Sequence, residues 1–310
     1  MKFWLGLLLL ALAMVAQAET WRFALIGDTP YSDYERAELP KMMAAIADSH
    51  VDFVAHIGDI KNGGSRCDDE VFADRLQLFN SSRVPFVYVP GDNEWTDCKR
   101  VSNGSYDSGE RLSKLRQMFW TEDFSLGRTK MPLQRQSASY PENARFQLGP
   151  VLFVTVNVPG SNNNRDESAN GGPEFAARNR AVLDWIRQGF AIARKDQLRA
   201  VAVLMQANPG IKHFNQGIPA NGYRELLETL RRESLNFRGQ VLLLHGDTHH
   251  HRIDHPLRDA DGNTLMRLTR VESYGYPFMG WVRVVIDSDS PELFRFESHN
   301  WTAADQARNN

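Results

Sequence analysis

Four Gly-Asp pairs recur along this sequence, and each follows a short run of apolar residues; the aspartates are Asp28, Asp59, Asp92 and Asp247. Short apolar runs are typical of strands that are covered on both faces. A glycine before the aspartate lets the backbone turn sharply or come close to a ligand. Side chains at the carboxyl ends of such strands converge on a ligand site. The pattern therefore predicts an α/β protein whose acidic residues meet at one edge of a sheet.

The spacing of apolar residues separates strands from helices along the chain. Apolar runs predict strands at 21–26, 53–57, 86–89, 151–158, 200–205 and 241–244. Helical spacing predicts helices at 41–48, 68–79, 108–119, 174–194 and 223–235. This alternation indicates an α/β fold. Three later runs, 265–271, 281–286 and 293–297, have no helices between them and indicate hairpins or a second sheet. The polar stretch 161–172 is expected to be a loop, either a plain surface loop or one that faces a substrate.

The gathered carboxylates indicate a metal site. Four negative charges at one edge would repel each other unless a cation neutralised them. His249 follows Asp247 by two residues, and carboxylates combined with histidine are common metal ligands.

The order of these motifs resembles the calcineurin-like metallophosphoesterase superfamily. That family has, in order, Asp-x-His, Gly-Asp, Gly-Asn-His-Asp/Glu, His-x-Pro and Gly-His-x-His. The corresponding stretches here are 27–30 (GDTP), 58–59 (GD), 91–94 (GDNE), 206–209 (QANP) and 246–249 (GDTH). The resemblance covers roughly residues 21–287. It implies a phosphoesterase with two metal ions, built as a four-layer αββα sandwich of two mixed sheets flanked by helices.

The sequence departs from the family pattern at five positions, which makes it a divergent, aspartate-rich member. Pro30 and Asn93 stand where the family has histidines, and Asp92 stands where it has asparagine. No histidine lies at 206–209, so Gln206 or Asn208 would replace it, and Asp247 replaces the first histidine of the last motif.

The resemblance divides the expected metal ligands between two ions. It assigns Asp28 and His249 to one ion and makes Asp59 the bridge. The second ion would take Asp92, Asp247 and an amide oxygen, from Asn208 or Gln206. This oxygen-rich set favours Mn²⁺ or Mg²⁺, with Fe, Zn²⁺ and Ca²⁺ as alternatives, and one or two ions are expected.

The expected chemistry is attack on phosphorus by a metal-bound hydroxide. Asn93 can hydrogen-bond a phosphate oxygen, but an amide cannot protonate a leaving group. Glu94 and His245, with His250 as a further alternative, are therefore the candidate acids. Asn62 and Asn157 are candidates for contact with the substrate.

The two cysteines, Cys67 and Cys98, are expected to form a disulfide. Cys67 lies eight residues beyond Asp59, and Cys98 lies six beyond Asp92. If both loops leave the same sheet edge, the bridge would brace the site.

The first eighteen residues have the pattern of a signal peptide. A lysine precedes an apolar run, and Ala16-Gln17-Ala18 is typical of a cleavage site. A signal peptide would direct the protein to the periplasm or outside the cell. Cleavage after Ala18 would leave one domain over residues 19–310, and an uncleaved anchor is the alternative. No later segment of the sequence is apolar and long enough to span a membrane.

Composition limits the partners. The chain has 310 residues and a formal net charge of −2, which argues against nucleic-acid binding through bulk positive charge. The expected function is hydrolysis of small phosphomonoesters or phosphodiesters. The alternative is a non-catalytic, metal-binding relative that acts as a binding module, and the oligomeric state stays open.

Overall fold

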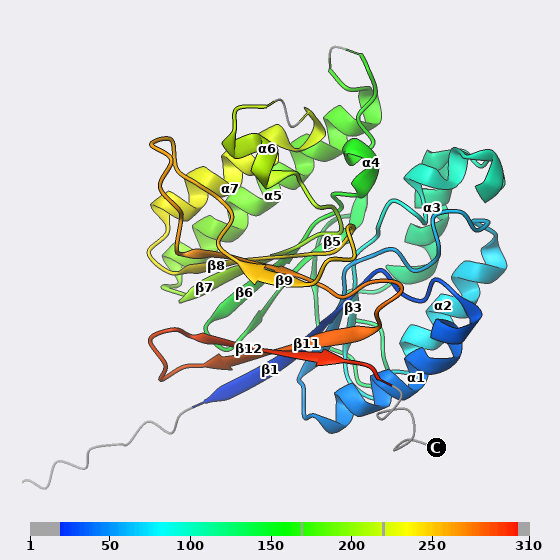
Figure 1. The fold of residues 1–310 in the computed structure, drawn as a ribbon, viewed down its shortest axis with the longest axis horizontal. Coiled ribbons are helices and arrows are strands. Elements are labelled where there is room, and N and C mark those ends of the chain that lie inside the picture. The colour runs from blue at the N-terminus through cyan, green and yellow to red at the C-terminus, as the bar shows by residue number, and fades with distance from the viewer. Residues whose placement is uncertain (1–18, 169, 219–220, 303–310) are drawn as a thin grey trace, which may run out of the picture.

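The computed structural model describes residues 19–168, 170–218 and 221–302. The predicted signal peptide, residues 1–18, lies outside the described residues. Within them the chain forms two mixed β-sheets with helices on their outer faces, as Figure 1 shows.

The first sheet has five strands: β1 (Thr20–Ile26), β2 (Phe53–His56), β3 (Phe86–Tyr88), β11 (Gly280–Asp287) and β12 (Phe294–Asn300). Their order is β12-β11-β1-β2-β3. Strands β1, β2 and β3 are parallel, whereas β11 is antiparallel to both β1 and β12. The late strands predicted at 281–286 and 293–297 therefore join the first sheet rather than a separate one.

The second sheet has seven strands: β4 (Gln134–Ser137), β5 (Tyr140–Leu148), β6 (Val151–Thr155), β7 (Ala200–Leu204), β8 (Gln240–His245), β9 (Arg252–Asp254) and β10 (Leu268–Glu272). Their order is β4-β5-β6-β7-β8-β10-β9. The central strands β6, β7, β8 and β10 are parallel, and the edges are antiparallel.

The longer helices are α1 (Asp33–Asp48), α2 (Asp69–Asn80), α3 (Ser108–Phe119), α5 (Pro173–Lys195) and α7 (Arg224–Asn236). Shorter turns are η1 (Thr96–Lys99), η2 (Val101–Asn103), α4 (Gly160–Asn163), α6 (Ile211–Asn215) and η3 (Asn221–Tyr223). Helix α1 begins eight residues earlier than expected, because Ser32 caps it by accepting a hydrogen bond from the Glu35 N–H, and Pro40 lies inside it.

Three buried clusters show how the layers pack. One joins the first sheet to α1, α2 and α3, and another joins the second sheet to α5 and α7. The third lies between the sheets, where Phe23 and Phe53 of the first sheet stack at 5.1 Å. Phe153 of the second sheet meets both rings edge-on at 5.2 Å. This confirms the predicted four-layer sandwich.

None of the helices in the described part of the chain is long and apolar enough to cross a bilayer.

Candidate metal centre

The loops that follow β1, β2, β3 and β8 bring the four predicted aspartates to one edge of the sandwich. Several hydrogen bonds join these loops directly. The Asp28 N–H donates to the Gly58 carbonyl at 3.0 Å. The Asp247 N–H donates to Asp28 Oδ1 at 3.0 Å, and the Asn93 N–H donates to Asp59 Oδ1 at 3.2 Å. We call Asp28, Asp59, Asp92, Asp247 and His249 the acidic cluster.

The backbone of the acidic cluster is strained. Asp28, Asp59, Asp247 and His249 have left-handed φ angles of 50°, 57°, 82° and 60°. Left-handed backbone at residues other than glycine costs on the order of 1–3 kcal/mol each and concentrates at functional sites. The fold therefore keeps four neighbouring residues in a costly conformation that fixes where their side chains lie.

Glycines allow the loops to approach the carboxylates closely. A β-carbon at Gly91 would lie 2.1 Å from Asp59 Oδ1. At Gly160 it would lie 2.7 Å from Asp92 Oδ2 and 2.8 Å from Asp247 Oδ1. Any larger residue would collide with the cluster, so both glycines are needed for the observed arrangement.

Burial and mutual repulsion make three carboxyl groups of the acidic cluster, those of Asp28, Asp59 and Asp247, costly to ionise. Burial, and then the charge of Asp247, raises the pKa of Asp28 well above its ordinary value. Burial, followed by the charges of Asp92 and Glu94, does the same for the pKa of Asp59. Burial, with the charge of Asp92, raises the pKa of Asp247 to about 7. A bound divalent cation would remove this repulsion, so the donor set fits hard metal ions.

His249 is oriented as a metal ligand would be. Its Nδ1 lies 2.7 Å from the carbonyl oxygen of Tyr276, which makes Nδ1 the protonated nitrogen. Its Nε2 lies 3.6 Å from Asp28 Oδ1, close to the separation of two atoms that share one ion. Burial also lowers the pKa of His249, which favours the neutral, ligating form.

The side chain of Gln206 contacts the acidic cluster at Asp247, whereas the side chain of Asn208 does not. Gln206 is fully buried and its Nε2 lies 3.3 Å from Asp247 Oδ1. The Asn208 side chain instead accepts from the Gly210 N–H at 3.2 Å, and only its backbone N–H reaches Asp247, at 2.8 Å. Gln206 Oε1, the atom that could bind a metal, accepts from the Gly160 N–H at 2.5 Å. The structure therefore places the Gln206 side chain against Asp247, and the choice between the two amides as a ligand stays a prediction.

Among the described residues, no three His, Cys, Asp or Glu side chains already converge as a preformed metal-binding group. The carboxylates are instead held by hydrogen-bond donors of neighbouring side chains. Asp92 Oδ2 accepts from the Ser161 hydroxyl at 2.8 Å, and Asp59 Oδ2 accepts from the Tyr31 hydroxyl at 2.8 Å. Metal binding would replace some of these hydrogen bonds.

Asn93 contacts the acidic cluster through Asp59. Its Nδ2 lies 2.9 Å from Asp59 Oδ2, 2.8 Å from the Tyr31 hydroxyl and 3.1 Å from the Lys61 carbonyl. The amide thereby holds the loops after β2 and β3 together, and its contact with phosphate stays a prediction.

Of the three candidate acids, Glu94 and His245 are fully buried and His250 is exposed. Glu94 accepts hydrogen bonds from the backbone N–H groups of Asp59, Ile60 and Gly91 and from the Tyr88 hydroxyl. Burial lowers the pKa of His245 to about 4, and its Nε2 has no hydrogen-bond partner among the described residues. Glu94 therefore shapes the loops around the cluster, and proton donation by any of the three residues stays a prediction.

Asn62 and Asn157 lie outside the hydrogen bonds of the acidic cluster. Asn62 Oδ1 accepts from the Gly64 N–H at 2.7 Å. Asn157 is buried, and its Nδ2 donates to Glu142 at 3.1 Å. Their contact with substrate stays a prediction.

Two residues that contact the acidic cluster, Tyr31 and Ser161, could not be recognised from the sequence. Tyr31 reaches Asp59 from the loop between β1 and α1, and its ring lies 5.2 Å from the His249 ring. Ser161 begins a run of four left-handed residues, Ser161–Asn164, inside the predicted polar loop. This loop therefore touches the acidic cluster through Ser161, and its contact with a substrate stays a prediction.

The predicted disulfide is present. Cys67 and Cys98 are bonded, with their Cα atoms 5.8 Å apart. Both sulfur atoms lie near the Asn93 carbonyl oxygen, at 3.5 and 3.7 Å. The bridge thus joins the loops that carry Asp59 and Asp92.

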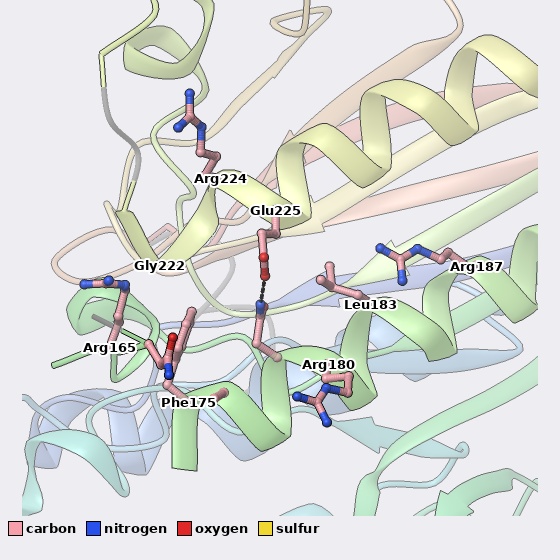
Figure 2. A pocket seen from close by; sticks show the side chains of 11 residues that line it. Arg165, Phe175, Arg180, Leu183, Arg187, Gly222, Arg224 and Glu225 are labelled. Carbon is pink, nitrogen blue, oxygen red and sulfur yellow. Dashed lines mark hydrogen bonds between the residues drawn. The ribbon is translucent and has the colours of Figure 1, made fainter. Parts of the chain in front are cut away.

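A separate cavity of about 630 Å³ lies between α5 and α7. Figure 2 shows side chains that line it. Its lining contains Phe175 and Leu183 with arginines spread around them, and no member of the acidic cluster. The metal centre is therefore not in this cavity.

The family model of the calcineurin-like phosphoesterases matches residues 22–251. No curated protein matches the chain in sequence.

Solved structures show the same fold at low sequence identity. A dimetal phosphatase from Danio rerio is 13% identical with a TM-score of 0.56, over 90% of this chain and 96% of its own. GAP50, described as the anchor in the inner membrane complex of Plasmodium, is 13% identical with a TM-score of 0.52, over 91% and 89%. Purple acid phosphatase PPD1 from yellow lupin seeds is 13% identical with a TM-score of 0.50, over 87% of this chain and 50% of its own. Because the family model matches residues 22–251, the chain belongs to the calcineurin-like phosphoesterases, a family of phosphoric ester hydrolases that use divalent metal ions.

Proposed function

We propose that this protein is an exported phosphoesterase that hydrolyses small phosphomonoesters or phosphodiesters at the acidic cluster. The observation that carries the proposal is the set of four left-handed residues, Asp28, Asp59, Asp247 and His249, at one edge of the sandwich. Such strain persists only where the surrounding structure holds it, and it gathers at sites of chemistry.

The residues divide as the family resemblance implies. Asp28, Asp59 and His249 would hold one ion, and Asp59, Asp92, Asp247 and Gln206 would hold the other. When bound, divalent ions polarise the phosphoryl oxygens and supply an activated water as the nucleophile. The protein contributes placement: Ser161 orients Asp92, and the Tyr276 carbonyl fixes the ring of His249.

The proposal of export rests on the signal-like segment at 1–18 and on the Cys67–Cys98 disulfide. Disulfides persist mainly in oxidising compartments such as the periplasm. Fractionation of the cells that make the protein, with mass determination of its N-terminus, tests this. Export predicts a chain that begins at Glu19, and an intact chain in the cytoplasm would refute it.

The enzymatic test uses 4-nitrophenyl phosphate and bis(4-nitrophenyl) phosphate, with Mn²⁺ or Mg²⁺ and then with a chelator. Turnover should require the metal ion. Asp59→Ala should lower kcat/KM by about a hundred- to a thousandfold, since a lost metal contact removes several kcal/mol of transition-state stabilisation. Asp196→Ala is the matched control, because Asp196 is exposed at the end of α5.

The competing function is a metal-binding module without catalysis. It is motivated by Asn93, which replaces the family histidine and is engaged by the loops around it. Metal binding with no turnover of either ester would favour this module over the enzyme.

A further inference from the structure

A second cavity, also of about 630 Å³, lies between α6 and β9. It is lined by residues of α6, by β9 and by the chain that follows β9 as far as Thr264. Asn208, from the loop after β7, forms part of its wall. This volume is within the range of about 300–1,000 Å³ that small-molecule sites occupy.

The lining of this cavity is basic. It includes Lys212, Arg252, Arg258 and Arg270 and contains no aspartate or glutamate. Arg270 pairs with Asp254, whose Oδ1 lies 2.7 Å from its Nε, and Arg252 pairs with Glu272 at 2.6 Å. Across the described ranges, Lys212 and Arg258 form no ion pair. Two positive charges are thus available to an anionic ligand.

Two connections join the cavity to the acidic cluster. The first is Asn208, whose backbone N–H donates to Asp247 Oδ2 at 2.8 Å. The second runs through Glu272, which is fully buried and binds both Arg252 and the Thr248 hydroxyl. Thr248 lies between Asp247 and His249 in the chain, so the basic cavity adjoins the cluster on the side of these two residues.

We propose that this cavity binds a second phosphate group of the substrate, while the acidic cluster hydrolyses the first. The proposal rests on the proposed phosphoesterase function and names its substrate class: small molecules that carry two phosphate groups. Guanidinium and ammonium groups are suited to phosphate oxygens. The size of the cavity fits a small molecule rather than a nucleic-acid strand.

The first test measures binding without catalysis. Metal is stripped with a chelator, the chelator is dialysed away, and butane-1,4-bisphosphonate is titrated into the full-length protein by calorimetry. Without metal the acidic cluster offers no cation to an anionic ligand, so binding reports on the basic cavity. The double variant Lys212→Gln/Arg258→Gln should bind at least about tenfold more weakly. Arg180→Gln/Arg187→Gln, which removes the same charge from the cavity of Figure 2, should bind as the wild type does. No binding by the wild type, or an equal loss in both variants, would overturn the proposal.

The second test compares phosphate release from butane-1,4-diyl bisphosphate and from butyl phosphate with Mn²⁺. The wild type should prefer the bisphosphate in kcat/KM by about tenfold or more, and Lys212→Gln/Arg258→Gln should lose that preference. Equal hydrolysis of both esters by the wild type would overturn this inference and leave the phosphoesterase function standing. Hydrolysis of neither ester would count against the phosphoesterase function, and the calorimetry would still decide whether the cavity binds phosphate.

Discussion

Individual residues set the geometry of the acidic cluster through close contacts between loops. Ser161 and Asp92 are 69 positions apart in the chain, yet their side chains form a hydrogen bond. The Gly-Asp pairs could be predicted from the sequence because a glycine at a strand end is a local signal. Ser161 and Tyr31 could not, since their positions depend on how distant loops meet.

Gly160 provides a test at this scale. Gly160→Ala should weaken Mn²⁺ binding by about tenfold or more, because the new methyl group would push Asp92 and Asp247 apart. Calorimetric titration with Mn²⁺ measures the effect. Gly109→Ala, in the first turn of α3, is the control. Its added β-carbon would come no closer to a neighbouring atom than 3.2 Å, the distance to Asp107 Oδ1. Equal Mn²⁺ affinity in the two variants would show that the close approach of Gly160 is unimportant.

Among the elements, the central strands agree with the sequence to within a few residues, because continuous apolar runs leave few alternatives. Strands β4 and β5, at one side of the second sheet, were not predicted, since their residues are largely polar or alternate in polarity. The left-handed turn in the loop at 161–172 was not predicted either. It is held by contacts from other elements: Arg178 of α5 binds Asn163 Oδ1 at 2.6 Å, and the Tyr223 hydroxyl binds the Pro159 carbonyl at 3.0 Å.

The disulfide tests how firmly the loops after β2 and β3 are held. Cys67→Ser/Cys98→Ser should lower the free energy of unfolding by about 3–4 kcal/mol, because the bridge closes a loop with a sequence separation of 31. Urea denaturation measures this change. Mn²⁺ affinity should fall as well, since the bridge braces the loops of Asp59 and Asp92. A loss of stability with unchanged Mn²⁺ affinity would show that the bridge stabilises the fold without bracing the site.

For the whole molecule, the acidic cluster links stability to pH and to metal. The unfolded carboxyl of Asp247 has a pKa near 3.8, and the folded one has a pKa of about 7. The metal-free folded state therefore binds more protons than the unfolded chain between these values, so its stability falls as pH rises through this window. The raised pKa values of Asp28 and Asp59 act in the same direction.

Thermal unfolding without metal should accordingly show a lower Tm at about pH 8 than at about pH 5. Mn²⁺ should raise the Tm more at the higher pH, because it competes with protons for the same oxygens. Asp247→Asn, which cannot ionise, should flatten the pH dependence. A wild-type Tm that rises with pH in the absence of metal would contradict this account of the cluster.

The central claim is that the acidic cluster is a metal centre. Anomalous diffraction from crystals soaked in Mn²⁺ tests it most directly. The account predicts one or two manganese peaks within about 2.0–2.2 Å of carboxylate oxygens of Asp28, Asp59, Asp92 or Asp247, with His249 Nε2 bound to one of them. Manganese only elsewhere on the protein, or none at this edge of the sandwich, would contradict it.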